Sequence, residues 1–531
     1  MQLLLSFYVA ILLVFQVSSG AKILFLIGLG SHSHRVAVQP LASKLADRGH
    51  DVTFVSARIP ESVHPKIKEL SFEKPFQAIL ESNDDITVPS VETRLKTKYI
   101  DYLLTYNNMW DVFYASNEVF LEDREFIKFI KETHFDVIIG DFVMKETVTV
   151  MAHFQNTKVI WFNSGGAQFM VDMELLGLPT ESSWLPDFSL GSPYSFVPNR
   201  FVYAFNSLWW YFSFHWYFLP KVNQLVEKNL GGGLPSFDEM VSNVDLVFVN
   251  EHFSHAYPRS LPPFVIPIGG MHCLNSNGTL PKSMETFIES VDSFVYMSFG
   301  SIINVTGLPD ELQNVLFDTV GSFPGVKFLW KWDGKLPANF PKNVLPMEWF
   351  PQQDVLAHPK CKGFVTQGGA MSFQQAIYHG VPMIVVPVWW DQPSMARIAM
   401  ELGVGIHLEL SEITRDSFRD ALTNIIYNKK YSEKSKLISQ LSKDRPMAPV
   451  ETAVWWTEYV LKHDTAHLKS PAIKQRWWQR RMLDFWMIVF LFALIAATII
   501  YKVVALVHRT LTISPKTLQP VNQSQSKVKR S

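Results

Sequence analysis

Short apolar runs alternate with longer, helix-like stretches through most of the chain. We expect strands where these runs cover residues 22–28, 51–56, 135–140, 157–163, 245–250, 264–268, 293–298, 327–331, 363–366 and 383–388. Continuous apolar runs separated by helical segments are typical of buried parallel strands with helices on both faces of the sheet. The pattern therefore predicts an α/β fold with two Rossmann-like, doubly wound domains that face each other across a cleft.

The first twenty residues, MQLLLSFYVAILLVFQVSSG, form an apolar run that ends in small residues. Ser18 and Gly20 stand where a signal peptidase prefers small side chains, so we expect residues 1–20 to be a cleaved signal peptide. The alternative is a first strand followed by a buried helix. The stronger strand pattern, AKILFLIGLG, begins directly after this segment and favours the signal peptide.

A second apolar segment lies near the other end of the chain. Residues 485–501 carry no charge and no proline, and we expect a transmembrane helix over 483–507. A bilayer core of about 30 Å needs roughly 20 helical residues, and Trp486 and Tyr501 are placed for an aromatic belt. The alternative is a buried core helix, which a polar, basic tail such as 508–531 would not be expected to follow.

The signal peptide sets the expected orientation of the chain in the membrane. It predicts a single-pass type I protein of the endoplasmic reticulum, with a lumenal body and a cytosolic tail. Asn277 and Asn304 each begin an Asn-x-Thr sequence and are predicted glycosylation sites. Asn522 begins a third such sequence on the cytosolic side, where it is expected to stay unmodified.

Residues 201–220 do not fit the α/β alternation. The segment has no charged residue, and eleven of its twenty residues are aromatic. Its length would permit a membrane span. Because Ser, Asn and His interrupt it, we instead expect a helical region that packs in the first domain, lines an acceptor cavity or rests on the bilayer surface.

Composition narrows the class of function. The 531 residues carry 48 Lys and Arg against 49 Asp and Glu, so the chain lacks the basic field that a nucleic-acid backbone requires. Its two cysteines, Cys273 and Cys361, cannot build a disulfide framework and form no CxxC pair for zinc. Phosphate-loop, GxSxG and HExxH patterns are also missing from the sequence.

Residues 349–396 hold several groups suited to a nucleotide sugar. Trp349 offers a flat face for a base, and Gln352 offers an amide for the nucleoside. Gly368 and Gly369 follow a strand and open a helix, whose free backbone N–H groups form an anion site. At the end of the next strand, Asp391 and Gln392 can hold sugar hydroxyls, so the expected ligand carries a base, a phosphate and a sugar.

The segment WFPQQDVLAHPKCKGFVTQGGAMSFQQAIYHGVPMIVVPVWWDQPSMA resembles the signature of the animal UDP-glycosyltransferases, which glycosylate small lipophilic molecules. The resemblance extends over nearly the whole chain and implies the GT-B fold. It implies an N-terminal acceptor domain over 21–270, a UDP-sugar domain over 285–445, and helices over 446–482 that return to the first domain.

The resemblance also assigns roles to residues. It implies that Trp349 stacks on uracil and Gln352 contacts the nucleoside, that Ser301 and Ser372 with the Gly368–Gly369 turn touch the diphosphate, and that Asp391 and Gln392 hold the sugar. His34 and Asp141 match the catalytic base and its partner, and imply an inverting displacement without a metal or other cofactor.

Four positions depart from the family pattern. Gln367 replaces a diphosphate-binding His, Gln375 replaces a ribose-binding Glu, Met395 replaces an Asn, and Trp390 stands where Gly is usual. These changes surround the sugar subsite without adding a cation, so we expect UDP-glucose rather than UDP-glucuronic acid as the donor. The alternative is a catalytically silent relative that binds lipophilic ligands or pairs with active homologues. A homo- or hetero-oligomer is compatible with either reading.

Overall fold

The computed structural model describes most of the chain, and its parts fall into two compact units. The described residues are 20–28, 32–57, 59–60, 62–72, 74–75, 77, 91, 94–95, 107–166, 174–178, 197–300, 305–388 and 390–512. One unit, the body, ends at Ile473, and the second begins at Lys474. The predicted signal peptide over 1–20 lies outside the described residues except for Gly20.

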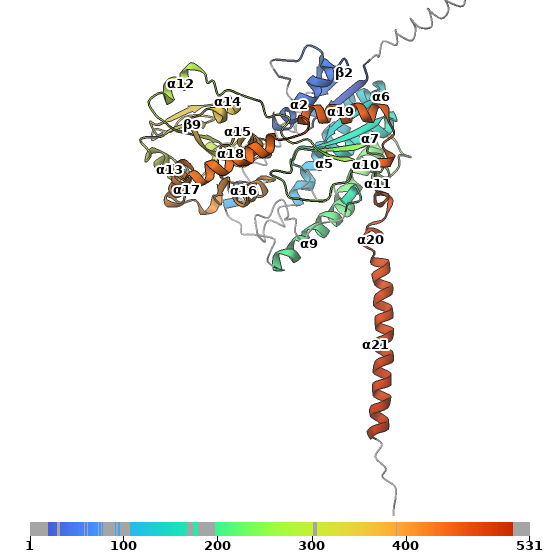
Figure 1. Ribbon diagram of the computed structural model, residues 1–531. Coiled ribbons are helices and arrows are strands. Elements are labelled where there is room, and N and C mark those ends of the chain that lie inside the picture. The colour runs from blue at the N-terminus through green and yellow to red at the C-terminus, as the bar shows by residue number, and fades with distance from the viewer. Residues whose placement is uncertain are drawn as a thin grey trace, which may run out of the picture. The chain divides into compact units, whose positions relative to one another are not determined.

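The first half of the body is built on a seven-stranded parallel sheet of order β3-β2-β1-β4-β5-β6-β7. The strands are β1 (Lys22–Leu26), β2 (Asp51–Val55), β3 (Ile67–Leu70), β4 (Val137–Asp141), β5 (Lys158–Asn163), β6 (Leu246–Val249) and β7 (Val265–Pro267). The chain starts in the middle of the sheet and winds outward in both directions, which is the predicted doubly wound arrangement. The inner strands are buried on both faces because helices cover both sides (Figure 1).

The helical segments of this half fill the connections between its strands. They are α2 (His32–Asp47), α5 (Asn107–Leu121), α6 (Arg124–Glu132), the 3-10 turn η1 (Phe142–Met144), α7 (Lys145–Gln155), α9 (Val197–Ser213), the π-helical turn η2 (Phe214–Phe218), α10 (Leu219–Leu230) and α11 (Phe237–Val241). Together with the sheet they enclose one large apolar core.

The second half repeats the design with a six-stranded parallel sheet of order β10-β9-β8-β11-β12-β13. Its strands are β8 (Phe294–Ser298), β9 (Lys327–Lys331), β10 (Val344–Met347), β11 (Cys361–Thr366), β12 (Met383–Val385) and β13 (Gly405–His407). The predicted α/β fold with two doubly wound sheets is therefore confirmed. The sequence pattern missed the short strands β3, β10 and β13, which lie at sheet edges.

Helices and short turns also connect the strands of this half, and the last of them extend beyond its sheet. They are α12 (Lys282–Ile288), η3 (Val305–Gly307), α13 (Asp310–Gly321), α14 (Gln352–Ala357), α15 (Ala370–His379), α16 (Gln392–Glu401), η4 (Leu410–Glu412), α17 (Arg415–Tyr427), α18 (Lys429–Lys443), α19 (Pro449–Lys462), η5 (Ala466–Leu468) and η6 (Pro471–Lys474). Two apolar clusters lie on the two faces of this sheet.

Helix α19 packs against the first domain rather than the second. Its Glu451 accepts from Lys44 at 2.8 Å and from Arg48 at 2.9 Å, both on α2. Ala453 and Val454 on the same helix are buried in the core of the first domain. The polypeptide therefore crosses back after the second sheet, and this return tethers the two halves of the body at a second place.

The aromatic segment 201–220 is helical, in α9, η2 and the start of α10. Trp210, Phe214 and Phe218 are buried in the first domain's core, so the prediction that the segment packs in the first domain is confirmed. The opposite side is open to solvent, with Phe201 73% exposed and Trp216 75% exposed. Since one face is committed to the core, a membrane span is not the structure of this segment.

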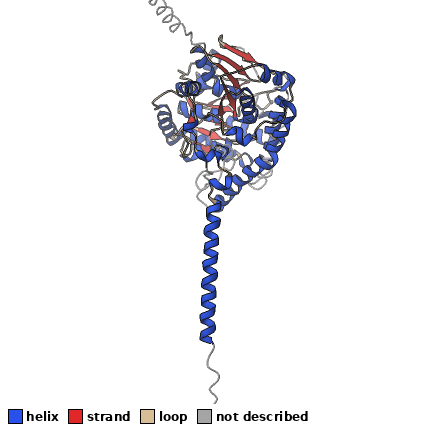
Figure 2. Ribbon diagram, turned by 90° about the vertical axis from the view of Figure 1, so that its right-hand side faces the viewer, coloured by secondary structure: helices blue, strands red, loops and turns tan. Residues whose placement is uncertain are grey.

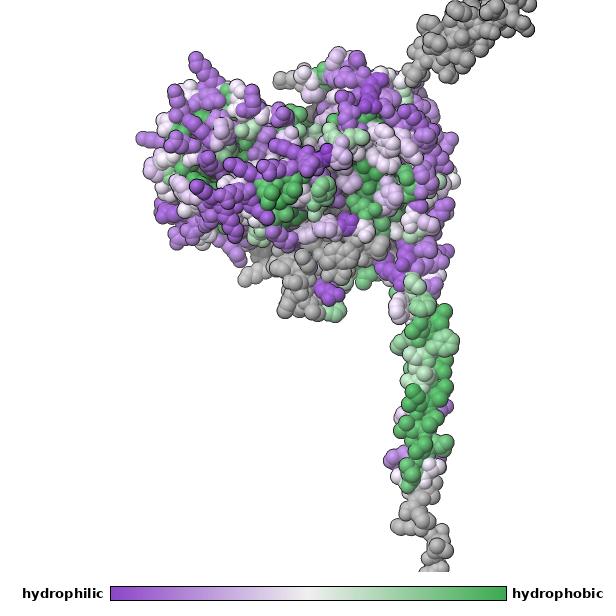
Figure 3. All heavy atoms as spheres, viewed as in Figure 1, coloured by the Kyte–Doolittle hydropathy of each residue, from purple (hydrophilic) through white to green (hydrophobic). Residues whose placement is uncertain are grey.

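The C-terminal unit contains α20 (Trp477–Arg480) and α21 (Leu483–Thr512). Among the described residues, α21 alone is long and apolar enough to cross a membrane. Figure 2 shows it as one unbroken helix, and Figure 3 shows its largely apolar surface. The helix includes the whole predicted span of 483–507 and continues five residues further, so residues 508–512, expected as part of the polar tail, are helical.

Candidate active site

His34 and Asp141 lie together at the carboxyl ends of neighbouring strands. His34 is in the first turn of α2, which follows β1, and Asp141 is the last residue of β4. These strands pair in parallel, with Leu26 opposite Gly140, so their ends meet at one edge of the sheet. His34 Nδ1 lies 2.5 Å from Asp141 Oδ2. The sequence prediction that paired these two residues is thus consistent with their observed contact.

The surroundings of Asp141 hold the pair in place. Its carboxylate is fully buried, and its second oxygen accepts from the backbone N–H of Val143 at 3.3 Å. On the other side, Ser164 Oγ lies 3.2 Å from Nδ1 and 3.3 Å from Nε2 of His34. Ser164 was not predicted from the sequence, although its position in the Asn-Ser-Gly-Gly turn at the end of β5 was a usable signal.

Two carboxylates determine the proton affinity of His34. Burial disfavours the charged imidazole, but Asp141 and then the charge of Asp391 outweigh it, and together they raise the pKa of His34 above its usual value. Burial likewise raises the pKa of Asp391 to about 6, against opposing backbone hydrogen bonds and the charge of His34. His34 in the first domain and Asp391 in the second therefore influence each other's pKa.

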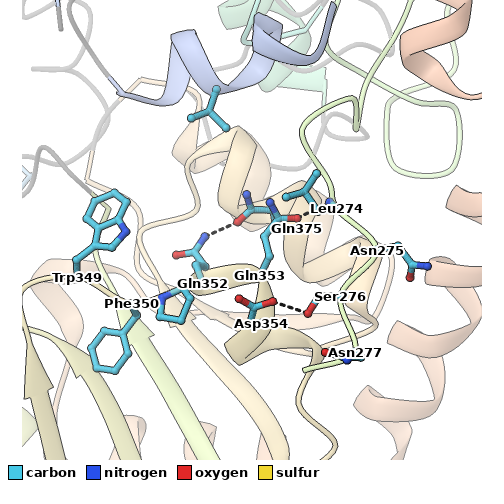
Figure 4. Close-up of a pocket in the computed structure, with 12 residues that line it drawn as sticks. Leu274, Asn275, Ser276, Asn277, Trp349, Phe350, Gln352, Gln353, Asp354 and Gln375 are labelled. Carbon is cyan, nitrogen blue, oxygen red and sulfur yellow. Dashed lines mark hydrogen bonds between the residues drawn. The ribbon is translucent and has the colours of Figure 1, made fainter. Parts of the chain in front are cut away.

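A pocket of about 730 Å³ lies at the carboxyl end of the second sheet. It holds the residues predicted for the nucleoside (Figure 4). The pocket is lined by Val36, Leu274, Asn275, Ser276, Asn277, Trp349, Phe350, Pro351, Gln352, Gln353, Asp354 and Gln375. The indole of Trp349 is 54% exposed, as a face that receives a base must be. The residues at 274–277 belong to the segment between the two sheets and were missed by the sequence reasoning.

Gln352 is the centre of a hydrogen-bond network on the floor of this pocket. Its amide nitrogen donates to Gln375 Oε1 at 2.6 Å and to Ser372 Oγ at 3.0 Å. Its oxygen accepts from the Tyr296 hydroxyl at 3.2 Å. Gln375 is thus a hydrogen-bond acceptor toward Gln352, a role that a glutamate at this position would also fill. The substitution keeps the local bonding while removing a negative charge.

Helix α15 begins directly after the turn at Gly368 and Gly369 that was predicted to bind a diphosphate. Gly368 has φ +87°, and a Cβ there would collide with Val385, so only glycine fits. Gly369 caps the helix, and the N–H of Ala370 donates to Asp391 Oδ2 at 2.9 Å. The carboxylate of Asp391 therefore lies at the anion-binding end of α15 in this structure.

Two further residues that depart from the family pattern, Gln367 and Met395, are both buried. Gln367 is 9% exposed, and its amide packs over Gly300, whose φ is +82°. Gln392, which matches the family pattern, accepts at Oε1 from the N–H of Val388 at 2.9 Å. Met395 is buried and belongs to the apolar core of the second domain. An asparagine at that position would place an amide in an apolar environment.

Several predicted positions lie outside the described residues: Ser301, Asn304 and Asn522. Asn277 is described and exposed, and its Oδ1 accepts from the Thr279 N–H at 3.1 Å and hydroxyl at 2.8 Å. It also lines the pocket that contains Trp349. A glycan on Asn277 would therefore stand at the rim of the predicted nucleoside site.

In the described part of the chain, no group of three or more His, Cys, Asp or Glu side chains is arranged to hold a metal ion. Cys273 and Cys361 are both free thiols. Burial raises the pKa of each thiol to about 12, so neither carries a thiolate at neutral pH.

Solved structures identify the architecture. The chain is similar to the calicheamicin glycosyltransferase CalG4, with TM-score 0.54 and 18% identity over 84% of this chain and 99% of that one. It is similar to a UDP-glucose: anthocyanidin 3-O-glucosyltransferase in complex with UDP, with TM-score 0.54 and 16% identity over 83% and 99%. The two sheets therefore form the GT-B fold of glycosyltransferases.

Sequence comparison identifies the family. The family model described as "UDP-glucoronosyl and UDP-glucosyl transferase" matches residues 22–516. UDP-glucosyltransferase 2 of Dactylopius coccus is 28% identical over 90% of this chain and 92% of that relative. UDP-glucuronosyltransferase 2B9 of Macaca fascicularis is 27% identical over 92% and 93%. The chain belongs to this family, and it is a glycosyltransferase that takes a sugar from a UDP-sugar.

Proposed function

We propose that this enzyme transfers glucose from UDP-glucose to a hydroxyl of a small lipophilic acceptor, with His34 as the general base. The observation that carries the proposal is the 2.5 Å contact between His34 Nδ1 and Asp141 Oδ2. Because that contact engages Nδ1, we assign Nε2, which lies 3.3 Å from Ser164 Oγ, as the ring nitrogen that takes the proton from the acceptor. The electrostatic influence of Asp391 on His34 supports a reaction centre between the two domains.

The reaction proposed is a single displacement. His34 removes the proton from the acceptor hydroxyl while its oxygen bonds to the anomeric carbon of the sugar. The bond from that carbon to the phosphate oxygen breaks, and UDP leaves with the electron pair. Asp141 stabilises the imidazolium that forms. One displacement at the anomeric carbon inverts its configuration.

Binding of the donor is proposed for the pocket beneath Trp349. The indole stacks on uracil, while Gln352 and Gln375 face the nucleoside. The N-terminal end of α15, with Gly368, Gly369 and Ser372, receives the diphosphate. Because Asp391 occupies the first amide of that helix, donor binding requires this carboxylate to turn toward the sugar hydroxyls.

The choice of glucose over glucuronic acid follows from charge. Asp391 belongs to the proposed sugar subsite, and a carboxylate on the sugar would be repelled by it. Arg397 lies close in sequence, but its guanidinium donates to the Tyr257 hydroxyl at 2.7 Å and to Ser394 Oγ at 3.3 Å. This cation is therefore engaged within the protein rather than with a donor carboxylate.

The acceptor and the location are proposed from the apolar parts of the chain. Phe142 is buried and stacks near His34, with ring centroids 6.1 Å apart, so the surroundings of the proposed base are apolar and suit a lipophilic acceptor. Helix α21 would anchor the enzyme in the membrane of the endoplasmic reticulum as a single-pass type I protein. Lipophilic acceptors concentrate in that membrane, so an anchored enzyme would meet them there.

The proposal is tested with the full-length chain purified in detergent micelles. UDP release is measured with 2-naphthol as acceptor and either UDP-glucose or UDP-glucuronic acid as donor. We expect kcat/KM to be at least about 10-fold higher with UDP-glucose, equivalent to about 1.4 kcal/mol. Preference for UDP-glucuronic acid would contradict the donor assignment. If no UDP-sugar is turned over but UDP still binds, the silent-relative reading replaces the proposed activity.

A further inference from the structure

Trp390 has a backbone conformation that tryptophan rarely adopts. Its φ is +63°, in the left-handed region that favours glycine. It immediately precedes Asp391 and stands where the family pattern usually has glycine. A bulky residue in this region costs conformational energy and persists only when its surroundings fix it. Such an outlier beside a predicted site is a reason to ask what the side chain does.

Trp390 belongs to the second domain, but its indole packs against the first domain. It meets the ring of Phe113, on α5, edge to face with centroids 5.6 Å apart and planes 89° apart. It also lies against the apolar core of the first domain. The turn that carries Trp390 is braced from within the second domain by the bond from Val388 N–H to Gln392 Oε1. The strained conformation is thus held from both sides.

Phe113 connects this contact to the catalytic pair. Its ring lies 6.4 Å from that of Phe142, at a near-perpendicular 80°. Phe142 in turn stacks near His34, with centroids 6.1 Å apart. Trp390, Phe113, Phe142 and His34 therefore form one continuous series of ring contacts. It runs from the donor-side loop of the second domain to the proposed base in the first.

We propose that Trp390 is a specificity-determining residue for the acceptor, supplied by the donor domain. The inference rests on the proposed function, since it takes His34 as the base that the acceptor must reach. Phe113 and Phe142 are themselves buried, so a flat aromatic acceptor with its hydroxyl at His34 meets this series of rings at the partly buried indole of Trp390. The chemical class selected is planar phenols over saturated alcohols of similar size.

The test compares Trp390→Gly with Trp390→Leu and Trp390→Phe in the full-length chain. Leu removes the aromatic ring while keeping apolar bulk, so it remains informative if the glycine variant fails to fold. Trp455→Leu is the matched control, because Trp455 is 49% exposed on α19. Calorimetry measures binding of UDP alone, and of 2-naphthol and decahydro-2-naphthol with UDP present. Turnover of the two acceptors is measured in parallel.

We expect the Gly and Leu variants to weaken 2-naphthol binding about 10-fold and decahydro-2-naphthol binding less than about 2-fold. The Phe variant and the control should stay within about 3-fold of the parent, and UDP affinity should be unchanged. Equal losses for both acceptors, or a loss confined to UDP, would overturn the inference. Ring-selective binding without any turnover would support the inference while refuting the proposed transfer.

Discussion

Replacing Asp141 with Asn tests the catalytic pair by removing a charge while nearly preserving shape. In the parent structure the buried carboxylate faces His34 Nδ1 at 2.5 Å. In the proposed transfer His34 becomes positively charged, and Asp141 would stabilise that charge in the transition state more than in the ground state. An amide of the same size retains a polar contact but loses the charge, and it also permits the wrong imidazole tautomer.

The size of the effect follows from the geometry. With the two charges centred about 4 Å apart and an effective dielectric constant of about 20, their interaction is worth about 4 kcal/mol. A loss of that size in the transition state corresponds to a rate reduction of about 10³-fold. The pKa of His34, which the carboxylates raise, also falls in the variant. The acid limb of kcat/KM, set by deprotonation of His34, therefore moves to lower pH.

The assay is UDP release from UDP-glucose with 2-naphthol, followed from pH 5 to pH 9. The control is Asp47→Asn, because Asp47 has a 57% exposed side chain at the far end of α2. We expect a loss of about 10³-fold in kcat for Asp141→Asn, an acid limb at lower pH, and no change in UDP affinity. A variant with more than a tenth of the parent rate, or an acid limb at the same pH, would refute the role assigned to Asp141.

Three further predictions test the donor site and the stability of the body. Burial lowers the pKa of His255 to about 3, so the free energy of unfolding should fall as the pH drops below 6.5, the pKa of an unfolded His. The variant His255→Gln should lose about 2 kcal/mol less than the parent between pH 7 and pH 5. An unchanged dependence of stability on pH, measured by calorimetry, would contradict this. Trp349→Ala should weaken UDP binding by about 10-fold or more, whereas Trp455→Ala should leave it unchanged in the same titration. Gly368→Ala, at φ +87° and against Val385, should lower the unfolding free energy by about 1–3 kcal/mol, which equal denaturant midpoints would disprove.

The inner strands were predictable because each is apolar on both faces. The buried strands β1, β4 and β8 appear in the sequence as uninterrupted apolar runs, and parallel sheets with helices on both sides require such runs. The strands β10 and β13 are only partly buried at sheet edges, so their composition differs little from that of a loop. These edge strands form because they pair with neighbouring strands, and that pairing depends on contacts between residues that are distant in the sequence.

The part of the site that could be predicted consists of residues at the ends of neighbouring strands, because the order of the strands brings those ends together. His34 and Asp141 follow strands that pair with each other, so their contact follows from the topology. The bond from Ala370 to Asp391 and the packing of Trp390 on Phe113 depend on how loops and domains meet. No local pattern of apolar and polar residues encodes these contacts, and so the sequence alone indicated the residue types but not their partners.

The role of His34 as the general base is tested most directly by measuring the turnover of His34→Ala and its UDP affinity on the same preparation. The control is His64→Ala, at a partly exposed side chain that lies 3.3 Å from Asp47. We expect the parent and the control to transfer glucose to 2-naphthol, whereas His34→Ala should bind UDP normally and lose at least about 100-fold in kcat. A His34→Ala enzyme that retains the parent rate would contradict the assignment of His34 as the base.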